Sequence, residues 1–357
     1  MTQLSAQDER WLDAAVRYAT PFLGTTGDNP CAAALIVDPH KQTLIARAVT
    51  ARGGRPHPEA IALENAGFDA AGATLYVTLE PCHHWGRTPP CADAIVRAGV
   101  MRVVIGVADP DPRTAQAGVE RLESAGIEVV LAEHAPSMAL HAGHMRHRVK
   151  ARPYVTVMMA VSPDDKVVTP ASGPARDWLD LQRSRSHAVL IGAATARHLD
   201  QQLAIALPGL ASRTPLRVVL SGAEGLDRSL NLIGGFSGYR TAIIAETTVS
   251  IDAPVSVEVL RVKGTKGRPD LSASLAALAD KGIQNLLVES GPRLTSALLL
   301  AGLVDCFGLI TTDAGDTAGP AASSTGPMAD LIREQGLVET GQQAHGAHTL
   351  KFFRRPA

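Results

Sequence analysis

Residues 57–91 contain a histidine, a glutamate and two cysteines whose types and spacing suit hydrolytic chemistry on zinc. His57 and Glu59 stand two positions apart, and Cys82 and Cys91 each follow a proline. One imidazole and two thiolates give Zn²⁺ three protein ligands and leave a fourth position open for water. Zinc lowers the pKa of such a water toward about 7. We therefore predict His57, Cys82 and Cys91 as metal ligands, and Glu59 as the catalytic group that carries the water's proton to a leaving amine.

Other interpretations of these four residues explain less. A structural zinc site needs a fourth protein ligand, and no further cysteine or histidine stands at a suitable spacing. A buried core histidine with two buried thiols, or a binding protein without catalysis, has no need of Glu59. The order of the motif is that of the nucleobase deaminases, but eight residues separate the cysteines where that signature has two.

Strands and helices alternate along the first 150 residues and must position this motif. Apolar runs predict strands at 32–37, 43–48, 74–79, 102–107 and 127–131, with helices at 7–20, 57–66, 90–98 and 116–125. This alternation predicts a three-layer α/β/α domain. His57 and Cys91 then begin helices, whose N-terminal ends stabilise thiolates.

The composition bounds the class of protein. The chain has 357 residues, 45% hydrophobic and 4% aromatic, which predicts two α/β domains with small-residue packing. A net charge of −1 without a basic block argues against a nucleic-acid surface. Apolar runs fall short of the roughly 18 residues that span a membrane, and the N-terminus lacks the pattern of a signal peptide. Four cysteines make no disulfide scaffold, so we expect a cytoplasmic protein with reduced thiols.

Residues 134–150 are polar and rich in histidine. His141 and His144 would be neighbours on a helix and could hold a metal, but we expect a solvated helix that links two domains. We place these domains at 1–148 and 149–357. In the second domain, strands are predicted at 154–161, 188–191, 216–220, 241–245, 255–262, 286–288 and 307–310, with helices between them.

The segment 72–91, GATLYVTLEPCHHWGRTPPC, resembles the deaminase of the bifunctional deaminase/reductase family of riboflavin biosynthesis. That family has the longer cysteine spacing and the pattern EPC-x-H-x-G-[RK]-TPPC. The resemblance covers nearly all of residues 10–150, including Asn29-Pro30 and Asp109-Pro110. It implies a cytidine-deaminase-like domain followed by a dihydrofolate-reductase-like domain. The implied substrate is the ribosylaminopyrimidine 5′-phosphate formed from GTP.

The resemblance also implies roles for individual residues. Asn29 would hydrogen-bond the pyrimidine, His84 would contact the substrate, and Asp109 would hold the ribose side. Arg87 and Thr88, in the loop between the cysteines, would bind the phosphate.

Some positions depart from the family pattern. Thr50 replaces a histidine seven residues before the zinc histidine, and Asp111 replaces an asparagine. Neither residue would touch the metal, but a carboxylate at position 111 would repel a phosphorylated sugar. A paralogous deaminase, for example of a toxoflavin-like azapteridine pathway, is therefore an alternative.

The second half resembles the NADPH-dependent reductase of the same family. The matching turns contribute Gly192 and Thr195 at one strand end, and Glu289 and Gly291 at another, as cofactor-binding candidates. The family also leads us to expect a homodimer or homotetramer.

The polar pattern of this reductase is eroded. Met158 replaces the lysine of the motif K-x-x-x-S-x-D-G, and Asp165 replaces its glycine. The family's W-I-T/S stretch is missing from 172–176, and the proline, threonine and arginine of a further motif are missing from 199–206. We therefore hypothesise an impaired or inactive reductase, which leaves NADPH binding open, with a fully bifunctional enzyme as the alternative.

Overall fold

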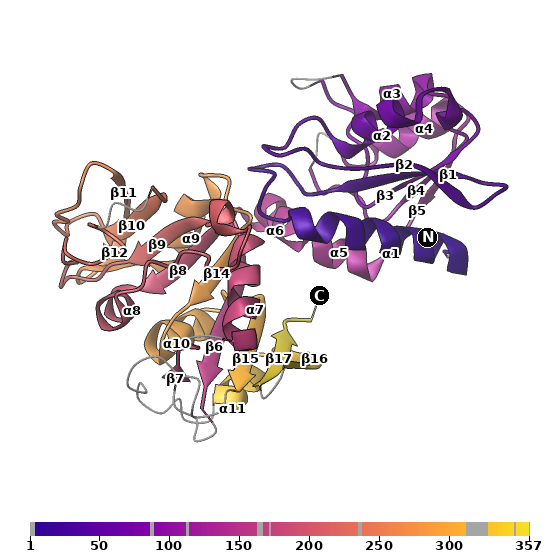
Figure 1. The fold of residues 1–357 in the computed structure, drawn as a ribbon. Helices are drawn as coiled ribbons and strands as arrows, with labels where there is room; N and C mark the ends of the chain where they lie inside the picture. Colours follow the sequence, from indigo (N-terminus) through magenta and orange to yellow (C-terminus); the bar gives the residue numbers. More distant parts are fainter. Residues whose placement is uncertain are drawn as a thin grey trace. The chain divides into compact units, whose positions relative to one another are not determined.

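The structure is a computed structural model that shows two compact units, Met1–Ala151 and Arg152–Ala357 (Figure 1). It describes residues 4–85, 89–111, 114–162, 167–170, 173–234, 238–311, 328–345 and 348–356. The domain boundary expected after residue 148 falls inside α6 (Ala142–Lys150), the last helix of the first unit. None of the helices in the described ranges is both long and apolar enough to cross a membrane.

The first unit is built on a five-stranded sheet of order β2-β1-β3-β4-β5. Its strands are β1 (Ala33–Asp38), β2 (Thr43–Val49), β3 (Thr74–Val77), β4 (Arg102–Ile105) and β5 (Glu128–Leu131). β1 is antiparallel to β2 and β3, whereas β3, β4 and β5 run parallel. The carboxyl ends of β3 and β4 therefore meet at one edge, so the segments that follow them lie close together.

Helices cover both faces of this sheet. They are α1 (Ala6–Ala19), α2 (Pro58–Ala66), α3 (Cys91–Arg97), α4 (Ala117–Ser124), α5 (Ala135–Leu140) and α6. Figure 1 shows α2, α3 and α4 on one face and α1 and α5 on the other. Side chains alternate accordingly, because Leu75 and Val77 join the core under α2 and α3 while Tyr76 joins the core under α1. The predicted three-layer α/β/α architecture is confirmed.

The prediction of a solvated helix at residues 134–150 is wrong. The segment forms α5 and α6, and the exposed fractions of His134, His141 and His144 are only 4%, 1% and 4%. His141 Nε2 lies 3.0 Å from Thr78 Oγ1, beyond the end of β3. These histidines belong to the core and wall of the first unit. Within the described ranges they form no metal-binding cluster.

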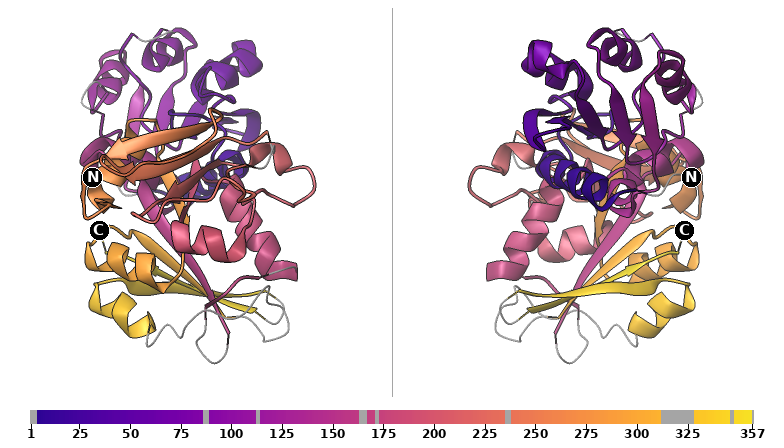
Figure 2. Two further views of the ribbon diagram at one scale, coloured as in Figure 1. Left: turned by 90° about the vertical axis from the view of Figure 1, so that its left-hand side faces the viewer. Right: turned by 90° about the vertical axis from the view of Figure 1, so that its right-hand side faces the viewer.

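The second unit is built on a ten-stranded sheet of order β11-β10-β9-β8-β14-β6-β15-β17-β16, with β7 paired to β6. Its strands are β6 (Tyr154–Val161), β7 (Val167–Val168), β8 (Ala188–Gly192), β9 (Leu216–Leu220), β10 (Thr241–Glu246), β11 (Val257–Val262), β14 (Asn285–Glu289), β15 (Cys306–Thr311), β16 (Val338–His345) and β17 (His348–Arg354). In this spatial order, the seven strands β11, β10, β9, β8, β14, β6 and β15 are parallel to one another. The last two strands, β17 and β16, form an antiparallel hairpin on β15 (Figure 2). A separate two-stranded sheet pairs β12 (Gly264–Thr265) with β13 (Arg268–Pro269).

Two core clusters lie on opposite faces of this larger sheet. Val155 and Val157 of β6 pack in the cluster that includes Leu298, whereas Met158 of β6 packs with Leu179. The helices are α7 (Gly173–Ser184), α8 (Ala193–Leu199), α9 (Leu271–Ala279), α10 (Pro292–Leu300) and α11 (Met328–Glu334). The unit is thus an α/β domain, and Met158 faces the side of the sheet covered by α7 and α8.

Candidate active site

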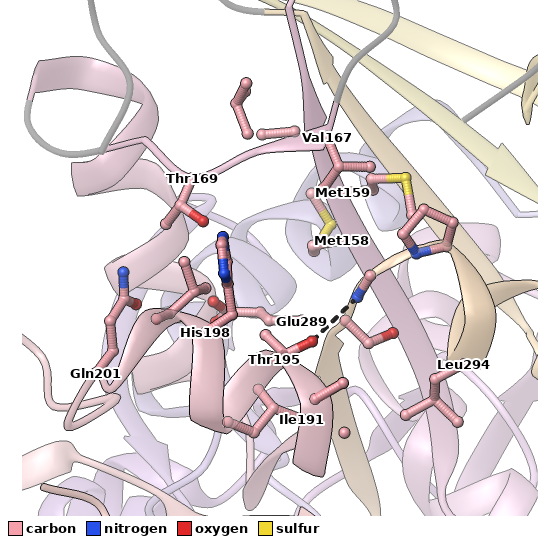
Figure 3. Close-up of a pocket in the computed structure, with 18 of the residues that line it drawn as sticks. Met158, Met159, Val167, Thr169, Ile191, Thr195, His198, Gln201, Glu289 and Leu294 are labelled. Atoms are coloured by element: carbon pink, nitrogen blue, oxygen red, sulfur yellow. Dashed lines mark hydrogen bonds between the residues drawn. The ribbon is translucent and has the colours of Figure 1, made fainter. Parts of the chain in front are cut away.

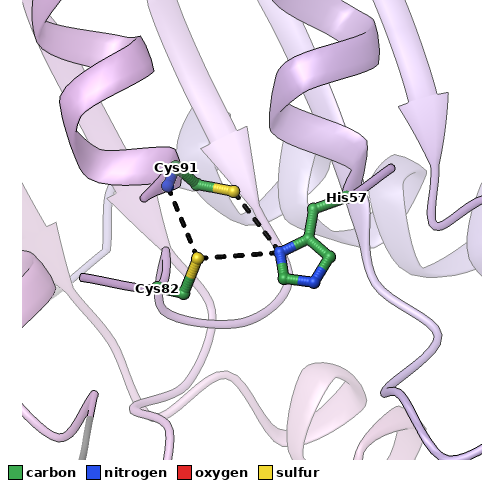
Figure 4. A group of neighbouring side chains, drawn as sticks. All are labelled: His57, Cys82 and Cys91. Atoms are coloured by element: carbon green, nitrogen blue, oxygen red, sulfur yellow. Dashed lines mark hydrogen bonds between the residues drawn. The ribbon is translucent and has the colours of Figure 1, made fainter. Parts of the chain in front are cut away.

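His57, Cys82 and Cys91 come together although they stand on three separate segments (Figure 4). His57 is the N-cap of α2, Cys82 lies beyond β3, and Cys91 begins α3. Nδ1 of His57 lies 3.7 Å from Cys82 Sγ and 3.4 Å from Cys91 Sγ. The backbone N–H of Cys91 also donates to Cys82 Sγ over 3.4 Å, which ties the two half-motifs together.

These three donors fit a zinc ion. Zn–S bonds of about 2.3 Å and a Zn–N bond of about 2.0 Å at tetrahedral angles place nitrogen and sulfur about 3.5 Å apart. The observed separations of 3.7 and 3.4 Å lie on either side of that value. One imidazole and two thiolates also leave the fourth position to a water, as a catalytic site requires.

The electrostatics of the cluster favour a metal-binding thiolate. A hydrogen bond from the Cys91 thiol lowers the pKa of Cys82, and the ring of His57 acts in the same direction. The hydrogen bond to Cys82 in turn raises the pKa of His57. The cluster thus already stabilises negative charge on Cys82.

Glu59 lies in the first turn of α2, directly after the histidine, and its side chain is buried. Burial raises the pKa of Glu59 to about 7. Its Oε2 atom is buried and has no hydrogen-bond partner in the described part of the chain. An orphaned carboxylate oxygen is costly unless a further group occupies the site, and a water held by the metal would be such a group.

Glu80 and Gly118, neither of which was predicted as a site residue, position Cys82. The buried Glu80 Oε2 accepts a hydrogen bond of 3.1 Å from the backbone N–H of Asp109, and burial raises the pKa of Glu80. A Cβ atom at position 118 would lie 2.2 Å from the carbonyl oxygen of Pro81. Only glycine therefore allows α4 to approach the segment that carries Cys82. The acidic residue of the EPC motif was the available signal for Glu80.

A cavity of about 640 Å³ opens in front of His57, Glu59 and Cys82. Three residues predicted to bind substrate line it, namely Asn29, His84 and Asp109. The other two, Arg87 and Thr88, lie outside the described residues. The lining residues that sequence analysis did not assign include Asp28, Arg55, Thr114, His144 and Arg148.

Each of the three predicted substrate-binding residues is held by a neighbour. Asn29 Nδ2 donates to Asp28 Oδ1 over 3.0 Å. His84 Nδ1 lies 3.2 Å from Thr114 Oγ1. Asp109 Oδ1 accepts the backbone N–H of residue 111 at 2.9 Å. These contacts orient polar groups at the cavity wall before any ligand arrives.

Thr50, which departs from the family pattern, has a structural task in the same wall. Its Oγ1 accepts the backbone N–H of Ala32 at 2.9 Å and donates to the carbonyl of Pro30 at 2.9 Å. The hydroxyl therefore joins the segment before β1 to the residue that follows β2, and Thr50 lines the cavity as well.

A second cavity, of about 370 Å³, lies within the second unit (Figure 3). It is lined by all four predicted cofactor-binding residues: Gly192, Thr195, Glu289 and Gly291. The two glycine turns meet there, because the N–H of Gly291 donates to Thr195 Oγ1 over 3.4 Å.

The carboxylate of Glu289 in this cavity is already engaged. The buried Arg183 binds both of its oxygens, at 2.6 and 2.7 Å. Met158 lines the same cavity, at the position where the family motif has lysine. The pocket is thus present, but the charge of Glu289 is paired with that of Arg183, and an uncharged methionine stands where the family motif has a lysine.

Comparison with known families matches both halves of the chain. Residues 5–107 match the cytidine and deoxycytidylate deaminase zinc-binding region. Residues 153–312 match the RibD C-terminal domain. The first match contains the histidine, glutamate and two cysteines, and the second contains the pocket of the second unit.

Curated relatives and solved structures agree. The chain is 34% identical to the riboflavin biosynthesis protein RibD of Escherichia coli, over 84% of this chain and 86% of that protein. It is 33% identical to RibD of Aquifex aeolicus, over 84% and 85%. The structure of Acinetobacter baumannii RibD aligns with a TM-score of 0.81 at 28% identity, covering 98% of this chain and 99% of that one. A deaminase/reductase structure from Thermotoga maritima aligns equally well, at 27% identity. The chain therefore belongs to the RibD family of riboflavin biosynthesis enzymes, with a zinc-dependent deaminase domain and a RibD reductase domain.

Proposed function

We propose that the first unit catalyses the zinc-dependent hydrolytic deamination of the ribosylaminopyrimidine 5′-phosphate derived from GTP. The observation that carries the proposal is the buried Oε2 of Glu59, which has no hydrogen-bond partner among the described residues and lies beside the three donors of His57, Cys82 and Cys91. A non-catalytic zinc site gives no reason to bury a carboxylate there. The Thermotoga maritima relative is described as a diaminohydroxyphosphoribosylaminopyrimidine deaminase and 5-amino-6-(5-phosphoribosylamino)uracil reductase.

Each residue has a distinct task in this reaction. His57, Cys82 and Cys91 would hold the zinc, which when bound supplies an activated water as nucleophile. Glu59 would carry one proton from the attacking water to the ring nitrogen. It would then take the proton of the newly formed hydroxyl group and deliver that proton to the departing amine. Its burial keeps bulk water from competing for that proton. The reaction replaces the amino group on the ring carbon by oxygen and releases ammonia.

The substrate is oriented by the polar groups of the cavity wall. Asn29 offers an amide to the pyrimidine edge, and His84 contacts the ring or sugar. Asp109 accepts hydrogen bonds from the ribose hydroxyls. Arg87 and Thr88, outside the described residues, are proposed to bind the phosphate. The cavity volume of about 640 Å³ suits a ligand of nucleotide size.

For the second unit we propose that reduction of the ribosyl group is impaired. Met158 offers no charge to an anionic cofactor or substrate, and both oxygens of Glu289 are taken up by Arg183. Working against this proposal, the hydrogen bond from Gly291 to Thr195 keeps the two turns of the pocket in place. A fully bifunctional enzyme with altered contacts is therefore the second candidate.

Product analysis tests both parts. The zinc-loaded chain receives the ribosylaminopyrimidine phosphate and NADPH, and the products are weighed by mass spectrometry. Deaminated product that still carries ribose is expected. Product that is both deaminated and reduced would establish the bifunctional alternative. If the chain holds its full complement of zinc but yields no deaminated product, the proposed substrate is wrong. An azapteridine precursor would then be the next compound to assay.

A further inference from the structure

The wall of the first cavity carries more carboxylates than a site for a phosphorylated substrate would be expected to tolerate. Its described lining residues include five carboxylates, those of Asp28, Glu59, Glu80, Asp109 and Asp111. They include two arginines, Arg55 and Arg148. A dianionic phosphate entering such a cavity is repelled by every carboxylate that lacks a cationic partner.

Helix α6 supplies partners for two of these carboxylates. His144 Nε2 lies 3.0 Å from Asp109 Oδ1, and Arg148 Nη2 lies 3.5 Å from Asp111 Oδ2. The two basic residues are four positions apart and therefore share one face of the helix. Their partners, Asp109 and Asp111, are two positions apart in the chain. A hydrogen bond from the backbone N–H of Asp111 to Asp109 Oδ1 joins them. The helix thus places the imidazole of His144 beside Asp109 and the guanidinium of Arg148 beside Asp111.

Asp111 needs such a partner more than a surface carboxylate does. Its side chain is only 7% exposed, so solvent screens its charge weakly. Arg148 is different, since its side chain is 36% exposed and lines the cavity. A partly exposed ion pair of this kind contributes little to the stability of a fold. Its larger effect is on the charge that a ligand in the cavity experiences.

We propose that Arg148 and Asp111 form a specificity-determining pair of the deaminase cavity. Arg148 cancels the charge of Asp111, and this allows the cavity to accept a sugar phosphate although an aspartate stands in its wall. The proposal rests on the proposed function for the identity of the substrate. It extends that function by assigning a role to two residues, of which one departs from the family pattern and the other was not recognised in the sequence.

The test is a charge-removal cycle on the zinc-loaded full chain, with two readouts. Arg148→Met keeps the length and apolar stem of the side chain and removes its charge. Ribose 5-phosphate serves as the probe in calorimetric titrations, with ribose as the uncharged reference. The KM and kcat for the ribosylaminopyrimidine phosphate are measured separately. Lys150→Met removes a charge from the same helix outside the cavity and is the matched control.

Arg148→Met is expected to weaken ribose 5-phosphate binding by about tenfold, because the charge of Arg148 then no longer offsets that of the buried Asp111 near the phosphate. Binding of ribose should change by less than about twofold, and the loss in turnover should lie in KM rather than kcat. Arg148→Met combined with Asp111→Asn should return the affinity to within about threefold of wild type, since neither charge remains. Lys150→Met should behave as wild type.

Two results would overturn the proposal: unchanged ribose 5-phosphate affinity in Arg148→Met, or no recovery in the double variant. Wild-type protein that does not bind ribose 5-phosphate would overturn it as well. Failure of the proposed function looks different, because the titrations would then show the expected cycle while the pyrimidine is not deaminated.

Discussion

Arg102 Nη1 lies 2.7 Å from Asp8 Oδ1, so that an ion pair ties α1 to the first residue of β4. Arg102 Nη2 binds the other carboxylate oxygen at 3.1 Å, and Tyr76 Oη donates to Oδ1 at 2.9 Å. The carboxylate of Asp8 is therefore shared between a helix and two neighbouring strands. This cluster holds α1 on its face of the sheet, opposite the face covered by α2 and α3, which carry two of the proposed zinc ligands, His57 and Cys91.

The Asp8 cluster predicts a pH-dependent stability. Burial alone would raise the pKa of Asp8, but hydrogen bonds from Arg102, Ser5 and Tyr76 outweigh it and lower the pKa to about 2. A depressed pKa stabilises the folded state above the unfolded value of about 4, and this contribution is lost as pH falls toward 2. We expect Asp8→Asn to lower the free energy of unfolding by about 2 kcal/mol at pH 7.

The measurement is denaturant unfolding of the full chain, followed by circular dichroism between pH 7 and pH 2. Wild type and Asp8→Asn should converge at the acidic end. Glu9→Gln, on the exposed side of the same helical turn, is the control and should follow wild type throughout. A constant difference between wild type and Asp8→Asn at all pH values would mean that lost packing, rather than charge, explains the effect.

Gly118 predicts a coupling between packing and metal binding. In Gly118→Ala the new methyl group would meet the carbonyl oxygen of Pro81 at 2.2 Å, so α4 or the segment bearing Cys82 must shift. Overpacking of this kind costs about 1–3 kcal/mol, and displacement of Cys82 should also weaken zinc binding. Competition with a zinc chelator and thermal unfolding measure the two effects. Gly222→Ala, where a Cβ meets nothing within 4 Å, should leave both unchanged. Wild-type zinc affinity in Gly118→Ala would show that the contact does not position the ligand.

Much of the fold was predictable because its strands are apolar and its motif residues stand at element ends. The run 154–161 was predicted as a strand and is β6, at the centre of the larger sheet. His57 and Cys91 were expected at helix starts and lie there. The hairpin of β16 and β17 was not predicted, because β16 reads VETGQQAH, a polar sequence that is stabilised by pairing at the sheet edge.

The site residues that were not predicted from the sequence were missed for a different reason. Arg148 meets Asp111, and His144 meets Asp109, across more than thirty positions of sequence. No local periodicity signals such a pairing, since it arises only when α6 packs beside the carboxyl end of β4. The sequence does show that Asp111 is an unfavourable charge near a phosphate. It does not show where the compensating cation stands.

Glu59 supports a prediction on catalysis that separates chemistry from metal binding. Glu59→Gln keeps the shape of the side chain but cannot take up a proton, so we expect turnover to fall by about 10²–10⁴. Zinc content by elemental analysis and the circular dichroism spectrum should remain those of wild type, because Glu59 is not one of the three clustered donors. Glu64→Gln, exposed on the same helix, is the matched control. Activity near the wild-type rate in Glu59→Gln would assign the proton transfer to another group.

Cys82 supports the complementary prediction on the metal. In Cys82→Ser a hydroxyl replaces the thiolate whose pKa is lowered by Cys91 and His57, and a hydroxyl is a poor ligand for zinc at neutral pH. We expect zinc affinity to fall by at least about a hundredfold and deamination to disappear with it. Chelator treatment of the wild-type chain should abolish activity in the same way, and added zinc should restore it only in wild type. Cys306→Ser is the control, because Cys306 is buried in β15 of the second unit, outside the cluster. Retention of one zinc per chain in Cys82→Ser would exclude this thiol from the ligand set and move the predicted site elsewhere.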